Sequence, residues 1–193
     1  MSNRRTDLIV PPHSVRYFPK GEHCTDAQPG DVLLVDHGTF SSDLILAGQR
    51  ALAITEPEIK PFTWVTHNAF VRESDLVSEM GFKGYERRTL LDYKAYFYGV
   101  VHFDMSDEQR ATTLAYDDAC QGVEYGWAEF VPEVIDGLTR ARFVGSWGSS
   151  IDCSTHVTLV MMGGGLFPDR SPYAVVPARV GLWVGADPTT APA

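Results

Sequence analysis

The chain lacks long apolar segments and an excess of positive charge, and it contains little cysteine. No stretch of about 18 apolar residues occurs, so the sequence predicts no transmembrane helix. Lys and Arg number 16 against 25 Asp and Glu, which gives a net charge of -9. An acidic protein repels phosphate backbones, so nucleic acid is not an expected partner. Only three of the 193 residues are cysteines, and three thiols cannot all pair with one another.

The N-terminal residues show no secretory signal. The apolar run there covers only residues 8–10, whereas the apolar part of a signal peptide spans roughly 7–15 residues. We therefore expect a cytoplasmic protein, with association with a virion or export by a non-classical route as the alternatives. A reducing cytosol keeps thiols free, so no disulfide is predicted.

The composition is that of a folded protein, with 44% hydrophobic and 21% charged residues. The length fits one domain. Residues 1–28 are polar and contain three prolines, so we interpret them as an irregular N-terminal arm. Residues 29–184 form the predicted domain, and residues 185–193 are interpreted as a flexible tail.

The hydrophobic pattern predicts an α+β fold, with a small antiparallel sheet packed against helices. Ser106 and Gln109 have the spacing of a capping box, so a helix should follow and end before Gly122. Four residues of this helix are expected to face the core: Ala111, Leu114, Ala115 and Ala119. Further helices are expected over residues 41–53 and 153–162, and extended segments over residues 31–36, 63–72, 75–80, 96–103 and 171–184.

The three cysteines occupy different settings. Cys24 lies in the expected arm and Cys120 at the end of the capped helix, where a buried thiol is the ordinary outcome. Cys153 follows a Gly/Ser-rich segment and begins a helix. Unpaired N–H groups and the helix dipole favour thiolate there, which is the nucleophilic form. The alternative is that Cys153 is a small apolar residue of a core helix.

A cysteine nucleophile needs an imidazole, and that imidazole needs an orienting group. His67 lies in an expected strand, and Glu79 lies twelve residues later in the next one. If the two strands form a hairpin across residues 72–75, both side chains reach the same face. The alternative is that His67 is a hydrogen-bonded core residue. His156 moves with Cys153 on one helix, so we interpret it as a packing or surface residue.

The sequence predicts no metal ion and no cofactor. A zinc site is conceivable from His13, His23, Cys24 and His37, but no CxxC or HxxxH spacing supports it. The predicted partner is a peptide or acyl substrate.

Seven short segments occur in an order that one protein family shares. Gly30-Asp31 begins a strand, His67 ends the run Trp-Val-Thr-His, Glu79 ends Leu-Val-Ser-Glu, and Cys153 stands in Asp-Cys-Ser at a helix start. The remaining segments are residues 87–93, 125–127 and 177–178. Over about residues 29–184 the chain thus resembles the circularly permuted NlpC/P60 group of papain-like proteins, in its YiiX-like branch.

This resemblance implies a circularly permuted papain-like fold and a cysteine peptidase or amidase. It makes Cys153 the nucleophile, His67 the base and Glu79 the orienting residue. It also implies a thioester intermediate and a peptidoglycan stem peptide as substrate, which would suit a phage-associated protein. The chain departs from the family at Thr155-His156, where Gly-Leu or Glu-Leu is common, so the rim of the site should be bulkier.

Two further functions stay open. Permuted members are also similar to lecithin retinol acyltransferase, so a thioesterase or acyltransferase on lipid acyl groups is one alternative. An acyl groove could be lined by Trp64, Phe70, Trp127 and Trp147, although a domain core explains the same residues. The other alternative is a structural or interaction protein that retains the fold without activity.

Overall fold

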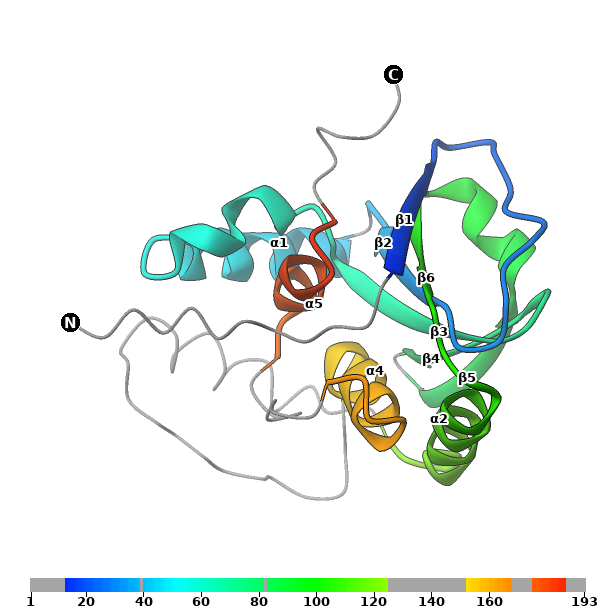
Figure 1. Ribbon diagram of the computed structural model, residues 1–193. Coiled ribbons are helices and arrows are strands. Elements are labelled where there is room, and N and C mark those ends of the chain that lie inside the picture. Colours follow the sequence, from blue (N-terminus) through cyan, green and yellow to red (C-terminus); the bar gives the residue numbers. More distant parts are fainter. Residues whose placement is uncertain (1–12, 39, 82, 125–151, 168–174, 187–193) are drawn as a thin grey trace.

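A computed structural model describes residues 13–38, 40–81, 83–124, 152–167 and 175–186. One six-stranded sheet has the order β1-β6-β2-β3-β4-β5, and every neighbouring pair is antiparallel (Figure 1). The strands are β1 (His13–Phe18), β2 (Val32–Asp36), β3 (His67–Glu73), β4 (Leu76–Gly81), β5 (Gly84–Thr89) and β6 (Phe97–Phe103). The helices are α1 (Phe40–Leu52), α2 (Asp107–Ala119), α4 (Cys153–Gly163) and α5 (Pro177–Trp183), with 3-10 helices η1 (Pro57–Phe62) and η2 (Leu90–Ala95). The expected α+β class and antiparallel sheet are confirmed.

The sheet is buried on both faces, because successive side chains of a strand point to opposite sides. On one face, Phe70 of β3 packs in a core that includes Val157 and Val160 of α4. On the other face, Ala69 of β3 belongs to a second core with Tyr93 of η2. Figure 1 shows α4 with α2 beside it on the first face and η2 on the second. Each fully buried large apolar side chain contributes about 1.5–3 kcal/mol, so these two cores hold α4 and η2 against the sheet.

Strands β3 and β4 form the expected hairpin. Ala69 stands opposite Glu79, and the register shifts between Val71 and Glu73 near the turn. His67 and Glu79 therefore lie on neighbouring strands and on the same face of the sheet.

Helix α2 begins as the sequence predicts, but of the four residues expected to face the core only Leu114 packs against it. Ser106 Oγ accepts a hydrogen bond from the Gln109 N–H at 3.2 Å, and Gln109 Oε1 accepts one from the Ser106 N–H at 3.0 Å. The expectation that alanines face the core is wrong, since Ala111, Ala115 and Ala119 are exposed. The fully buried residues of this helix are Thr113 and Asp117.

The burial of an acidic residue explains this difference. Asp117 accepts hydrogen bonds from Arg72, from Ser78 Oγ at 2.6 Å and from Tyr85 Oη at 2.8 Å. His156 Nε2 lies 2.8 Å from Asp117 Oδ1, so His156 is a fully buried packing residue and not a surface one. A buried carboxylate is stable only with partners of this kind.

Two other expectations about local structure are corrected. Residues 13–18, expected in an irregular arm, form β1 and pair with β6, from His13 opposite Phe103 to Phe18 opposite Tyr98. Cys24 is also buried, so this part of the expected arm belongs to the core. Residues 177–183 form α5 and not an extended segment, because Pro177 occupies the first turn of a helix, where its missing N–H costs nothing.

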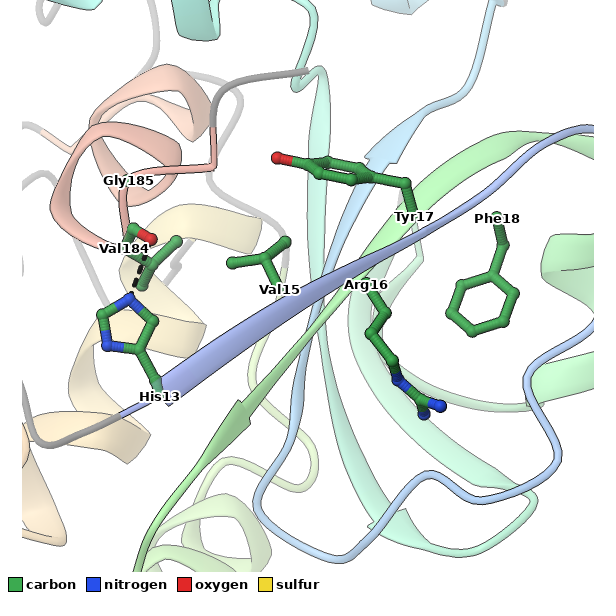
Figure 2. A pocket seen from close by; sticks show the side chains of 7 residues that line it. All are labelled: His13, Val15, Arg16, Tyr17, Phe18, Val184 and Gly185. Carbon is green, nitrogen blue, oxygen red and sulfur yellow. Dashed lines mark hydrogen bonds between the residues drawn. The ribbon is translucent and has the colours of Figure 1, made fainter. Parts of the chain in front are cut away.

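Strand β1 is an edge strand with a hollow of about 640 Å³ beside it (Figure 2). His13 donates from Nε2 to the carbonyl oxygen of Val184 at 2.9 Å and so ties β1 to the end of α5. The lining comprises His13, residues 15–18 and residues 184–185. None of the candidate catalytic residues is among them.

Among the described residues, no helix has the length and apolar character needed to cross a membrane.

Candidate functional site

His67 and Glu79 form a buried pair. His67 is the first residue of β3, and its Nε2 lies 2.7 Å from Glu79 Oε2. The His67 side chain is 10% exposed and that of Glu79 is 2% exposed. The sequence-based expectation that these two side chains meet across a hairpin is therefore met in the structure.

Glu79 is held by two further donors. Tyr93 Oη donates to the same carboxylate oxygen as His67, and Arg88 Nε lies 2.6 Å from Oε1. Tyr93 comes from η2 and Arg88 from β5, so three elements besides β4 fix this carboxylate. A carboxylate with this many partners is a rigid orienting group for an imidazole.

Opposite charges stabilise each other in this pair. Burial acts to lower the pKa of His67, but the charge and hydrogen bond of Glu79, together with the nearby Cys153, outweigh it and raise the pKa to about 10. Burial likewise acts to raise the pKa of Glu79, but His67, Tyr93 and Arg88 outweigh it and lower the pKa to about 2. At neutral pH the pair is an imidazolium and a carboxylate.

Cys153 is the first residue of α4 and interacts with this pair. Its thiol lies near enough to His67 to raise the pKa of the imidazole. Because Nε2 of His67 faces Glu79, Nδ1 is the ring nitrogen left for Cys153. A second contact supports the same placement, since Asn68 Nδ2 donates to Ser154 Oγ at 3.2 Å. The three candidate residues Cys153, His67 and Glu79 are thus brought together in one buried group.

The start of α4 is capped by Asp152. Its Oδ1 accepts a hydrogen bond from the Thr155 N–H at 2.7 Å, and burial raises its pKa to about 6. The nearby Ser154 backbone also favours the charged form of the carboxylate. A helix start provides unpaired N–H groups, and that of Cys153 belongs to the same residue as the thiol, where an oxyanion would develop.

The other two cysteines have less reactive surroundings. Burial raises the pKa of Cys120 to about 11, and burial is also the main reason why the pKa of Cys24 is raised. All three thiols are buried, and none of them forms a disulfide, as the sequence predicts. Since thiolate is the reactive form, Cys24 and Cys120 should react slowly at neutral pH.

His37, His67 and Glu79 each bring one possible ligand atom within 4.8 Å of the others. The two imidazole rings are stacked, with centroids 4.6 Å apart and planes at 20°. Lone pairs of stacked rings run nearly parallel and do not converge on one ion, and the Glu79 oxygens already accept from Arg88 and Tyr93. The residues therefore do not fit a metal ion.

The conceivable zinc site does not assemble in the described part of the chain. His13 bonds the Val184 carbonyl, and Cys24 contacts Arg16 and Asp26. Among the described residues, neither joins His37 in a group that could hold a metal ion.

Sequence reasoning missed the roles of Arg88, Tyr93 and His37 around the pair. Arg88 and Tyr93 entered only as part of a family-like segment, and His37 carried no pattern. Glu86 stands directly opposite Glu79 on β5, so Arg88, two residues on, lies on the same face of the sheet. The alternation of side chains along β5 was therefore the feature of the sequence that could have placed Arg88 on the same face as Glu79.

Several expectations fall on residues outside the described ones. These are residues 125–127 of the family-like pattern, the Gly/Ser-rich segment before Cys153, and Trp127 and Trp147 of the conceivable acyl groove. Of that groove's other members, Phe70 is fully buried in the core, and Trp64 packs against Tyr17 and Phe97.

Comparisons of this chain with protein-family models, with curated proteins and with solved structures gave no match. Function is therefore inferred from the site itself.

Proposed function

We propose that the protein is a cysteine hydrolase that cleaves an amide bond through a thioester on Cys153. The observation that carries this proposal is the buried ring of His67, whose Nε2 lies 2.7 Å from Glu79 Oε2 and whose pKa is raised by both Glu79 and Cys153. A nucleophile, a base and an orienting group in this order are the parts that thiol catalysis requires. No other cysteine among the described residues has an imidazole and a carboxylate arranged in this way.

The first half-reaction forms the thioester. The Cys153 sulfur attacks the acyl carbon as the thiolate, with the proton held on His67, and the π electrons move to the carbonyl oxygen. The Cys153 N–H stabilises that oxyanion. When the carbonyl re-forms, the C–N bond breaks and His67 gives its proton to the leaving amine.

The second half-reaction releases the acid. Neutral His67 takes a proton from a water molecule as its oxygen attacks the thioester carbon. The C–S bond then breaks, Cys153 leaves as thiolate, and His67 is again the imidazolium that Glu79 stabilises. Glu79 does not touch the substrate in either step and acts by orienting and charging His67.

A cell-wall peptide is the first substrate to test, because the resemblance to the permuted NlpC/P60 group implies it. An ester or thioester of a fatty acid would pass through the same intermediate on Cys153. The residues described around the three side chains favour neither leaving group, so the substrate class is an outcome of the experiment.

The test compares purified muropeptides with short acyl esters as substrates of the wild type, Cys153→Ser and Cys24→Ser. We expect muropeptide cleavage that Cys153→Ser abolishes and that Cys24→Ser, a matched change at another buried thiol, leaves within twofold. Turnover of esters alone would replace the peptidase with an acyl-transfer enzyme. The enzyme proposal fails if Cys153→Ser retains wild-type turnover, or if iodoacetamide alkylates wild-type Cys153 no faster than Cys24 at pH 7.

A further inference from the structure

The ring of His37 lies flat against the ring of His67. The centroids are 4.6 Å apart and the planes differ by 20°. His37 directly follows β2, and Val35 of β2 pairs with His67 of β3. His37 follows the end of β2, and His67 is the first residue of the neighbouring strand β3. The two imidazoles therefore lie at the same end of the sheet.

The backbone at His37 is tied to the residue before His67. The His37 N–H donates to Thr66 Oγ1 at 3.1 Å, and that hydroxyl donates to the carbonyl oxygen of Val35 at 3.2 Å. The Thr66 N–H bonds the same carbonyl at 2.9 Å. These hydrogen bonds fix the backbone of His37 relative to that of Thr66, the residue before His67. The stacking of the two rings therefore does not depend on a flexible loop.

A second ring contacts His37 as well. Tyr96 packs against it with a centroid distance of 4.5 Å and planes at 43°. Burial, together with the charge of His67, lowers the pKa of His37 to about 3. His37 is therefore neutral at any working pH, and a neutral ring can stack on the His67 imidazolium without charge repulsion.

A stacked ring restrains a motion of the His67 ring that its hydrogen bond to Glu79 alone leaves free. The Nε2–Glu79 bond fixes one atom of the His67 ring, but the ring can still tilt about that contact. Stacking against His37 restricts this tilt and so keeps Nδ1 on the side of Cys153. A displacement of about 1 Å at a reacting group can cost on the order of a hundredfold in rate, so such a restraint matters for catalysis.

We propose that His37 is a positioning residue that holds the His67 ring in the plane in which it faces both Glu79 and Cys153. This inference rests on the proposed function of Cys153 as nucleophile. His37 itself transfers no proton, and its role requires a flat ring and not an imidazole nitrogen.

The experiment measures the rate at which iodoacetamide alkylates Cys153 between pH 5 and 9, with peptide mass spectrometry to separate it from Cys24 and Cys120. The full-length wild type is compared with His37→Leu, which fills the space without a flat ring, and with His37→Phe, which restores the ring. We expect His37→Leu to lower the rate at pH 7 by tenfold or more and His37→Phe to stay within threefold of wild type. Circular dichroism and the Tm of each variant show whether it is folded. If His37→Leu is not folded, His37→Gln takes its place, and if His37→Phe is not folded, His37→Tyr takes its place.

The outcomes separate the two proposals. If wild-type Cys153 reacts rapidly and His37→Leu reacts equally fast, the positioning role is overturned while the proposed function stands. If His37→Phe is as slow as His37→Leu, the flat ring is not what matters and the inference is also overturned. If wild-type Cys153 reacts no faster than Cys24, the proposed function fails and the role of His37 fails with it.

Discussion

Replacing Glu79 with Gln should destabilise the protein in a way that depends strongly on pH. The substitution keeps the size of the side chain and removes its charge. In the wild type the carboxylate accepts from His67 at 2.7 Å, from Arg88 at 2.6 Å and from Tyr93. An amide presents one oxygen and one NH2 group to these three donors, so at least one of them loses its partner. Breaking a buried ion pair in this way typically costs about 3–5 kcal/mol.

The pH dependence follows from the two shifted pKa values. The pKa of His67 is about 10 against an ordinary 6.5, so its contribution to stability is complete below pH 6.5 and is lost as the pH rises toward 10. The pKa of Glu79 is about 2 against 4.5, so its contribution is present above pH 4.5 and is lost as the pH falls toward 2. The pair is therefore most stabilising between about pH 4.5 and 6.5.

The magnitude can be bounded from His67 alone. Each tenfold change in proton affinity is worth about 1.4 kcal/mol, so the difference between 6.5 and about 10 corresponds to at most about 5 kcal/mol. The two contributions describe one interaction and are not added. Without the Glu79 charge, burial becomes the dominant influence and keeps His67 neutral. We expect the variant to lose about 3–5 kcal/mol near pH 6 and clearly less at pH 10.

Urea unfolding followed by tryptophan fluorescence at pH 5, 6, 8 and 10 measures the difference in free energy of unfolding between the wild type and Glu79→Gln. The matched control is Glu86→Gln. Glu86 lies opposite Glu79 and contacts the half-exposed Arg88 at 3.3 Å. That control should change stability by less than about 1 kcal/mol. A Glu79→Gln difference that is the same at every pH, or larger at pH 10 than at pH 6, would refute the assignment of a buried imidazolium–carboxylate pair.

Three further substitutions test the surrounding structure. Asp117→Asn removes the buried charge that faces Arg72 and should lower the free energy of unfolding by about 3 kcal/mol in urea, whereas Asp118→Asn, at a half-exposed neighbour, should cost less than about 1. Asp152→Ala should lose about 1 kcal/mol of helix capping in the same assay and Asp152→Asn almost none, since Asn caps equally well. Gly84→Ala should lower the Tm by several degrees, because φ is +97° there and an added Cβ would lie 2.5 Å from a backbone oxygen. Equal effects within the Asp117 and Asp118 pair or within the Asp152 pair, or an unchanged Tm for Gly84→Ala, would contradict these assignments.

The part of the site that sequence could predict is the part made by one hairpin. His67 and Glu79 lie on adjacent strands joined by a short turn, so the alternation of side chains alone places them on one face. The contact between His67 and Cys153 is of another kind. It depends on where α4 packs on the sheet, which is set by apolar contacts of residues such as Phe70 and Val157 that are distant in sequence. The local sequence around His67 and Cys153 therefore does not indicate where α4 packs on the sheet.

The errors have a common physical origin in partners that sequence does not display. Asp117 is not among the residues that the sequence predicts to face the core, because an unpartnered carboxylate is rarely buried. Its partners Arg72, Ser78 and His156 come from two strands and another helix. Strand β1 was missed for a similar reason: it lies at the sheet edge, where polar residues such as Arg16 remain exposed to solvent and obscure the alternation.

The packing of α4 on the sheet has a consequence for how the protein is made. The sheet is complete only when β6 has been synthesised up to Phe103, because β6 pairs with both β1 and β2. The apolar side chains of Val32 and Phe70 are covered by α4 only after that helix, which ends at Gly163, has been synthesised. At about 5–20 residues per second, the 60 residues between Phe103 and Gly163 take roughly 3–12 seconds to translate. During that interval the apolar sheet face of Val32 and Phe70 lacks the cover that α4 gives it in the folded protein.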